Sequence, residues 1–393
     1  MVRQMIQDLH MLKEKNKDNC VFCSMLSPFV KMDNRYNFGP LENKGEEDIS
    51  FQSFYNSSPL IKGEKVSYSE AIQEVKKIIK SEESIHIDGL STDLQSMYKI
   101  IDFAERYRAS INHMCSDELN IFFSAFQKYG GSFVSFNELK NRADFVLVIG
   151  AKHNSFSSYF YRELNWNKQK EKNTIFFLDQ LKIKKTSSFC QDIIDQVNYL
   201  KSFLLTESVS KDLELKHLKE KFIKSKFPVV LANIKTKDYA LVHSTFDFVR
   251  LMNKTTRMKI FNIFGSHNSG GFVNACVTKT GYPNAINFTE IGAIYEPYLI
   301  SVEKQKKIKN LQIYISNFQP DPDFLFFKRN IFIGHPNFAK KKKVDVFLPT
   351  TTPGLDADGL IVRSDNGGVL KLKKSFDSNY LSPIDLIEEI QKN

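Results

Sequence analysis

The chain has 393 residues, of which 42% are hydrophobic and 25% are charged, and its formal net charge is +10. This balance excludes a disordered chain, and the length allows two domains or several packed layers around a substantial core. No apolar run approaches the roughly 20 residues needed to cross a bilayer, and the first residues lack the apolar stretch of a signal peptide. We therefore expect a cytoplasmic protein that does not associate with a membrane.

The positive charge alone does not identify a partner. The lysines are spread along the chain, and only Lys340 to Lys343 form a contiguous run. No zinc-finger spacing, RNP pattern or basic helical stripe accompanies the charge, which favours a solvated lysine-rich surface over a nucleic-acid partner. The five cysteines follow no regular framework, as is typical of a reducing compartment.

Helix and strand patterns alternate from about residue 60 onward, after a polar stretch that is typical of a loop. Residues 71–83 carry apolar side chains at helical spacing, with Ser67 or Ser69 as the expected cap. A short strand at 84–88 ends at Gly89, and helical periodicity returns over 92–106 and over 116–129. This strand–turn–helix passage is typical of α/β proteins.

Apolar strands recur through the rest of the chain, with helical stretches between them. They are expected at 144–151, 173–180, 227–233, 258–264, 311–318, 329–334 and 344–349. Continuous apolar runs of this kind belong to strands that are buried on both faces, as in parallel sheets. The alternation predicts a mostly parallel α/β architecture built from two interleaved units.

A thinned cysteine motif lies near the N-terminus. Cys20 and Cys23 have the C-x2-C spacing of an iron–sulfur ligand set, but Ser27 stands where a third cysteine would follow. A [4Fe–4S] cluster needs four sulfur ligands, and the remaining cysteines are isolated by long intervals. We interpret the pair as vestigial, with half of a zinc site as the alternative, for which a second ligand pair is absent.

Five segments together resemble the pterin-binding subunit of formylmethanofuran dehydrogenase, a relative of the molybdopterin oxidoreductases. The segments are the cysteine motif at Cys20, Asp88–Thr92, Asn141–Gly150, Thr280–Phe288 and Val344–Asp365. They occur in the order that the family has, and they span most of the chain. The resemblance implies a molybdopterin-oxidoreductase-like core of two interleaved α/β domains with mostly parallel sheets.

The same resemblance implies a division of the chain into three parts. A degenerate iron–sulfur-type module is expected at 1–59, and an inserted Rossmann-like α/β domain at 151–259. A discontinuous α/β domain would be formed by 60–150 together with 260–393.

The reactive positions depart from the pattern of this family. In the family, tungsten or molybdenum is bound by a cysteine that a catalytic histidine follows, whereas this chain has Cys115, Ser116 and Asp117. Serine cannot shuttle a proton near neutral pH as histidine does, and a carboxylate would repel an anionic dithiolene cofactor. His113 lies on the other side of Cys115. The thiol itself is either a retained ligand or a small buried side chain near a helix start.

A second departure concerns charge. Where the family has two arginines, this chain has Glu290 and Ile294. Arginine clamps carboxylates and phosphates through bidentate hydrogen bonds, and a glutamate reverses that charge. The resemblance therefore predicts no catalytic residues, with Cys115, Ser116 and Glu290 as vestigial positions. It also predicts that no cofactor is bound and that both molybdopterin and the [4Fe–4S] cluster have been lost.

A glycine-containing loop follows one of the expected strands. Its candidate residues for binding a cofactor or an anion are Gly265, His267, Asn268, Gly270 and Gly271. Glycines allow backbone amides to converge on an anion, and the matching segment of the family approaches the pterin. The lysine and hydroxyl of a P-loop are missing, so nucleotide hydrolysis is not expected. Residual anion binding and a tight structural turn both stay open.

Two pairs of opposite charge flank expected strands. We interpret Arg142 with Asp144, and Arg363 with Asp365, as local ion pairs at element boundaries rather than as parts of a site.

The resemblance extends to a hydrolytic branch, the formyltransferase/hydrolase complex of bacteria that oxidise formaldehyde through tetrahydromethanopterin. There, a transferase subunit moves a formyl group to a methanofuran-like carrier, and an amidohydrolase-like subunit releases formate. The counterpart of the pterin-binding subunit in that complex performs no redox chemistry. The resemblance thus implies a non-catalytic scaffold subunit with those two subunits as partners, and the positive charge would suit a polyglutamylated carrier tail.

Two other functions stay open at the level of the sequence. An active tungsten- or molybdenum-dependent subunit of formylmethanofuran dehydrogenase would use Cys115 as the metal ligand, and would need another electron route and another proton donor. A nucleic-acid or nucleotide binder would need a continuous basic face.

Overall fold

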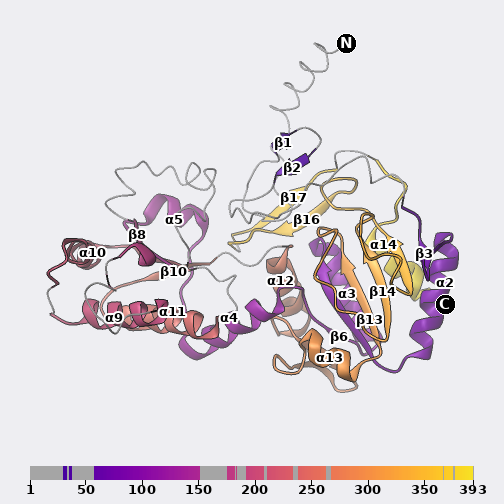
Figure 1. Ribbon diagram of the computed structural model, residues 1–393, viewed down its shortest axis with the longest axis horizontal. Helices are drawn as coiled ribbons and strands as arrows, with labels where there is room; N and C mark the ends of the chain where they lie inside the picture. Colours follow the sequence, from indigo (N-terminus) through magenta and orange to yellow (C-terminus); the bar gives the residue numbers. More distant parts are fainter. Residues whose placement is uncertain are drawn as a thin grey trace, which may run out of the picture.

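The computed structural model describes residues 30–32, 35–37, 57–150, 175–181, 183, 192–207, 210–232, 238–262, 267–365, 367–374 and 377–392. Within these ranges the strands form a nine-stranded sheet, a four-stranded sheet and two hairpins (Figure 1). The strands are β1 Val30–Met32, β2 Arg35–Asn37, β3 Leu60–Ile61, β4 Glu64–Lys65, β5 Ile85–Ser91, β6 Ser110–Ile111, β7 Phe145–Ile149, β8 Ile175–Phe177, β9 Pro228–Ala232, β10 Lys259–Asn262, β11 Ile286–Thr289, β12 Gly292–Tyr295, β13 Leu311–Ser316, β14 Arg329–Gly334, β15 Val346–Pro349, β16 Gly359–Val362 and β17 Val369–Leu372. The helices are α2 Tyr68–Ser81, α3 Leu94–Arg106, α4 Ser116–Tyr129, α5 Phe136–Arg142, η3 Leu178–Gln180, α9 Ile193–Leu205, α10 Leu213–Lys224, α11 Tyr239–Met252, α12 Ser269–Thr280, α13 Val302–Ile308 and α14 Pro383–Gln391.

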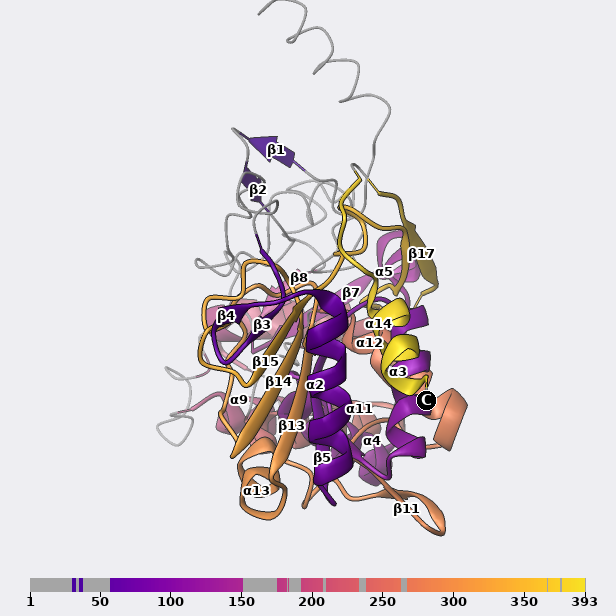
Figure 2. The same cartoon turned by 90° about the vertical axis from the view of Figure 1, so that its right-hand side faces the viewer.

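The nine-stranded sheet has the order β12-β11-β6-β5-β13-β14-β15-β3-β4. Its five central strands, from β6 to β15, pair in parallel, and antiparallel hairpins close both edges. Helices α2, α3, α12 and α14 bury their apolar stripes against one face of this sheet. Figure 2 shows α2 lying in front of the strands, with α3 and α14 beside it.

Helix α2 illustrates how the local sequence produces these elements. Its apolar positions recur at helical spacing, so one stripe is buried while the lysines face solvent. Ser67 caps the helix: its hydroxyl accepts the Glu70 N–H, and the Glu70 carboxylate accepts the Ser67 N–H. Such a capping box contributes about 1 kcal/mol. The sequence allowed Ser67 or Ser69 as the cap, and the structure selects Ser67.

The opposite face of the nine-stranded sheet is covered by aromatic side chains rather than by helices. Because side chains alternate along a strand, Ile313 faces the helices and Tyr314 faces the other side. There Tyr314 packs near Phe324 and Phe332, and Phe338 stacks on Phe332 at 3.7 Å between ring centroids. The chain between β13 and β15 therefore forms the second cover of this sheet.

The four-stranded sheet, β10-β9-β7-β8, is parallel throughout and is buried on both faces. Helices α4, α9, α10 and α11 pack on one face, and α5 packs on the other. The strand β7 reads Phe-Val-Leu-Val-Ile, an apolar run with every side chain buried, as a strand covered on both sides requires.

The expected fold class, α/β with mostly parallel sheets, is confirmed. The expected domain boundaries at 150/151 and 259/260 stay a prediction, and β7 and β10, which flank them, both pair with β9 in the four-stranded sheet. The expected N-terminal module at 1–59 lies almost entirely outside the described residues. Among the described residues, none of the helices combines the length and the apolarity that spanning a membrane requires.

Candidate functional site

The order of the nine-stranded sheet contains a topological switch point between β5 and β13. From β5 the chain continues to β6 on one side, while β13 leads to β14 and β15 on the other. In open parallel sheets, connections that diverge in this way leave a crevice at the carboxyl ends of the two strands, and ligands bind there. The residues that follow these strands are therefore the candidate site.

The loop after β6 brings Cys115 to this edge. It continues alongside β5, because the Asn112 N–H donates to the Ile87 carbonyl and the Met114 N–H donates to the Gly89 carbonyl, both at 3.0 Å. Gly89 has a φ of +82°, and a Cβ there would lie 2.6 Å from the Ile315 oxygen. Only glycine permits this close approach of β5 to β13.

His113 is held inside this loop. Its Nδ1 accepts the Cys115 N–H at 3.0 Å, so Nε2 carries the proton and donates to the His267 carbonyl at 3.3 Å. The imidazole is 1% exposed and packs near the ring of Phe272. Burial lowers the pKa of His113 to about 4. Near neutral pH the ring is uncharged, and both of its nitrogens are engaged.

Cys115 occupies the N-cap position of α4 and is half-buried. Ser116 turns its hydroxyl back to the His113 carbonyl, and the His113 N–H donates to the same hydroxyl at 2.9 Å. Asp117 and Glu118 lie in the first turn of α4, where negative charge favours the helix dipole. The structure thus explains Ser116 and Asp117 as residues that start a helix.

A buried acid lies next to this loop. Asp88, at 6% exposure, accepts the Gly89 N–H at 2.7 Å, and its second oxygen is 3.8 Å from Nε2 of His86. Burial would raise the pKa of Asp88, but the contact with His86 and the Gly89 N–H outweigh it, so the pKa lies below its usual range. The carboxylate is therefore ionised and already engaged inside the sheet.

Four side chains that the sequence analysis missed complete the crevice. Ser91 and Thr92 follow β5, Asn317 follows β13, and Thr351 follows β15. Each side chain is buried and carries an oxygen without a hydrogen-bond partner among the described residues. Buried polar atoms are normally satisfied, so these oxygens mark a place where a water or a ligand would bind.

A signal for these residues was present in the sequence. The stretches DGLST, YISNF and LPTTT each place hydroxyl or amide side chains directly after an apolar strand. The carboxyl ends of parallel strands meet at one edge, so such residues come together there. Hydroxyls and amides can orient a ligand, but they are poor proton donors or acceptors near neutral pH.

The glycine-containing loop lies beside this crevice at the start of α12. His267 and Asn268 both have a left-handed backbone, with φ of +59° and +60°. The buried Asn268 amide donates to the Thr92 carbonyl at 3.0 Å and accepts the Val362 N–H at 2.9 Å. A Cβ at Gly271 would lie 2.4 Å from the Asn268 amide oxygen. The glycine thus makes room for a side chain of this protein, while Gly265 lies outside the described residues.

Glu290 does not lie at this edge. Strand β11 is antiparallel to β6, with Ile286 opposite Ile111, so the chain after β11 returns toward the amino end of β6. There Glu290 forms an exposed ion pair with Arg108 at 2.5 Å. The structure therefore does not bring Glu290 together with Cys115 and Ser116, and the reversed charge at this position does not act on the crevice.

The two local ion pairs inferred from the sequence have different outcomes. Arg363 and Asp365 do pair, through two hydrogen bonds of 2.9 and 2.6 Å. The Asp365 carboxylate also accepts the Phe136 N–H, which ties the end of β16 to α5. Arg142 does not pair with Asp144, because Asp144 accepts two backbone N–H groups in front of β9.

Comparison with known proteins places this fold. No family of related sequences matches the chain, and no curated protein matches it. Among solved structures, a chain in the X-ray structure of the formyltransferase/hydrolase complex from Methylorubrum extorquens, in complex with methylofuran, matches with a TM-score of 0.72 and 13% identity. That match covers 85% of this chain and 97% of the other chain.

Acetylene hydratase from Pelobacter acetylenicus also matches, with a TM-score of 0.53 and 11% identity. The match covers 86% of this chain but only 61% of the hydratase chain, so this protein spans about three-fifths of its length. At these identities the likeness establishes a shared α/β fold.

The residues at the crevice do not complete a ligand set for a pterin-bound metal or a cluster. Among the described residues, no group of three His, Cys, Asp or Glu side chains lies close enough to hold a metal ion. Cys115 would be the one sulfur donor, and both nitrogens of His113 on its loop are engaged. Cys20 and Cys23 lie outside the described residues, so the loss of the [4Fe–4S] cluster stays a prediction.

Proposed function

We propose that this chain is a non-redox, non-catalytic scaffold subunit of a formyltransferase/hydrolase-type complex, in the place that the pterin-binding subunit holds in formylmethanofuran dehydrogenase. In such a complex, a formyl group passes from tetrahydromethanopterin to a methanofuran-like carrier and leaves as formate. The observation that carries the proposal is the loop after β6, where the imidazole and the hydroxyl next to Cys115 both form internal hydrogen bonds. Without a free acid or base beside the thiol, redox chemistry on formate lacks its proton transfer.

The fold likeness supports the same proposal, because the match spans 97% of a chain in a formyltransferase/hydrolase complex. The partners would be a formyltransferase subunit and an amidohydrolase-like subunit. The crevice with Ser91, Thr92, Asn317 and Thr351 would then offer hydrogen bonds to a bound molecule without reacting with it. A polyglutamylated carrier tail would be attracted by the net charge of +10.

Purification of the full chain from its own cells tests the proposal. The purified assembly should release formate from formyl-tetrahydromethanopterin and should contain tungsten, molybdenum and iron far below one atom per chain. Near-stoichiometric tungsten or molybdenum together with dye-linked formate oxidation would instead establish the active dehydrogenase subunit. Cross-linking and mass spectrometry would identify the subunits that touch this chain.

A substitution at Cys115 sharpens this test. Because the thiol is assigned no chemical role, Cys115→Ser should leave formate release by the purified assembly within about twofold of the wild type, as expected for a residue outside the machinery. A metal-ligating thiol cannot be replaced by serine without loss of activity. Abolished turnover in a folded Cys115→Ser assembly would therefore contradict the scaffold function.

A further inference from the structure

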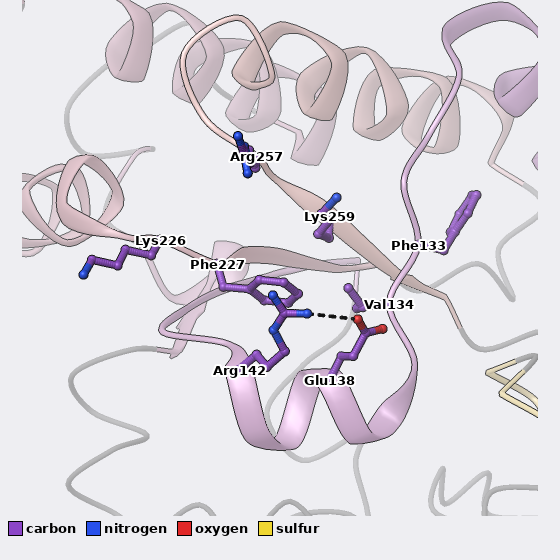
Figure 3. A pocket seen from close by; sticks show the side chains of 8 residues that line it. All are labelled: Phe133, Val134, Glu138, Arg142, Lys226, Phe227, Arg257 and Lys259. Atoms are coloured by element: carbon purple, nitrogen blue, oxygen red, sulfur yellow. Dashed lines mark hydrogen bonds and ion pairs between the residues drawn. The ribbon is translucent and has the colours of Figure 1, made fainter.

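A cationic pocket lies at the amino-terminal edge of the four-stranded sheet, away from the crevice (Figure 3). Its cations are Arg142 at the end of α5, Lys226 before β9, Arg257 before β10, and Lys259 in β10. We define the cationic pocket by these four residues. Its volume is about 220 Å³.

The positive charge of this pocket is largely uncompensated. Glu138 is the one carboxylate that lines it, and its Oε1 lies 3.4 Å from Nη1 of Arg142. Lys259 donates to the Ser132 hydroxyl at 2.8 Å, which is a neutral partner. Among the described residues, no carboxylate forms an ion pair with the side chains of Lys226, Arg257 or Lys259. Four cations therefore face one acid.

The floor of the pocket is apolar. The Arg142 guanidinium lies 4.3 Å from the centroid of the half-buried Phe227 ring, and Val134 lies beside it. Phe133 forms the far wall and is 40% exposed. Figure 3 shows Lys226 and Phe133 at opposite ends of the pocket, with Arg142 and Glu138 between them. Such a surface can take up both carboxylates and an apolar side chain.

The size of the pocket selects among anionic ligands. Sites for cofactor-sized molecules usually enclose roughly 300–1,000 Å³, so a pocket of about 220 Å³ is too small for one. Arg142, Lys226 and Arg257 are exposed and come from separate segments, so they form a rim rather than a closed cage around one small ion. A rim of cations around an apolar floor fits a short stretch of polypeptide with one anchoring side chain.

We propose that the cationic pocket docks an acidic segment of a partner protein. Carboxylates of that segment bind the rim, where the guanidiniums of Arg142 and Arg257 accept bidentate partners, and one apolar side chain packs on Phe227 and Phe133. The inference rests on the proposed function only in that the chain works within a protein assembly. Exposed ion pairs are individually weak, so the docking depends on several of them and on the apolar anchor.

A synthetic peptide tests this docking. The probe is a fluorescein-labelled decapeptide in which glutamates alternate with leucine and phenylalanine, and its binding to the full chain is followed by fluorescence anisotropy. The double charge reversal Lys226→Glu with Arg257→Glu should weaken binding at least about tenfold, because it turns the rim from attraction to repulsion. Raising the salt from 50 to 300 mM should also weaken binding by about tenfold.

The matched control is Lys306→Glu with Lys307→Glu in α13, two exposed lysines in the part of the chain that carries the nine-stranded sheet. It changes the net charge equally and should alter binding by less than about twofold. Equal weakening by both double variants would mean that only the net charge attracts the peptide, and would overturn the proposal.

Two further probes define the ligand. A decapeptide with serine in place of leucine and phenylalanine should bind about tenfold more weakly, which corresponds to 1.4 kcal/mol for the lost anchor. Inorganic phosphate at constant ionic strength should not compete. Competition by phosphate in the peptide's own concentration range, or no peptide binding at all, would overturn the docking. An assembly that still releases formate in either case would leave the proposed function standing.

Discussion

His113 lies beside the one thiol at the crevice, where an imidazole would be expected to act as a proton carrier. Burial and two hydrogen bonds hold it neutral instead, with a pKa of about 4. The unfolded chain takes up a proton on this side chain below pH 6.5, whereas the folded chain does so only near pH 4. Falling pH therefore stabilises the unfolded state across this interval.

The free energy of unfolding should fall by about 3 kcal/mol between pH 7 and pH 4 through His113 alone, since each pKa unit corresponds to about 1.4 kcal/mol. Urea unfolding at a series of pH values measures this loss. His113→Asn keeps an acceptor for the Cys115 N–H but cannot be protonated, so its stability should depend less steeply on pH in this interval. Identical pH dependences of variant and wild type would contradict the assignment, as would an imidazole NMR signal of His113 that titrates above pH 5.

Single residues differ in how far the sequence reveals their place. Cys115 and Ser116 were identified from neighbouring residues, and they do share one loop at the crevice. Glu290 was grouped with them, yet the antiparallel pairing of β11 with β6 carries it to the other edge of the sheet. Local patterns carry no information on this pairing, since the partner strand lies far away in the chain. The crevice oxygens of Asn317 and Thr351 were missed for the same reason.

At the scale of elements, the apolar runs predicted the strands that form the core of both sheets. The expected strands at 144–151, 227–233 and 329–334 appear as β7, β9 and β14. Helix α4 has the predicted bounds of 116–129. The division of these strands between two sheets was not predicted, because an apolar run identifies a buried strand and not its neighbours.

The start of α12 depends on one amide. Asn268 satisfies the Thr92 carbonyl and the Val362 N–H, which are otherwise buried without partners, and it does so from a left-handed backbone. Asn268→Ala should therefore destabilise the protein by about 3–5 kcal/mol in urea unfolding, since each unsatisfied group costs about 1–3 kcal/mol and alanine adds backbone strain. Asn268→Gly should lose about 1 kcal/mol less, because glycine relieves that strain. A loss below about 1 kcal/mol for the alanine variant would contradict this account.

A second substitution isolates the close approach of Gly271 to the same amide. Gly271→Ala should destabilise the wild type, because its Cβ would lie 2.4 Å from the Asn268 amide oxygen. In the Asn268→Gly background the obstacle is gone, and alanine should be neutral or stabilising by up to about 1 kcal/mol within the helix. The double-mutant cycle in urea unfolding measures this coupling. Additive effects would show that another contact determines the need for glycine.

At the scale of the whole molecule, α4 connects the two sheets. It starts at the crevice of the nine-stranded sheet and packs along α11 of the four-stranded sheet, as Figure 1 shows. Leu119 belongs to the apolar core of the first sheet, Phe122 and Ala125 belong to that of the second, and Phe123 packs against both. Packing changes on one sheet can therefore reach the other through one helix.

Two substitutions in α4 separate the stabilities of the two sheets. Leu119→Ala and Phe122→Ala each remove a buried side chain and should each cost about 3 kcal/mol, but in different cores. Hydrogen exchange followed by mass spectrometry should show that Leu119→Ala mainly lowers the protection of β5 and β13, while Phe122→Ala mainly lowers that of β7 and β9. Phe123→Ala, which removes the contact shared by both cores, should lower the protection of all four strands to a smaller extent. If the three variants lowered protection in the same strands by the same amounts, the two sheets would unfold as one unit, and α4 would not be a separate connection between them.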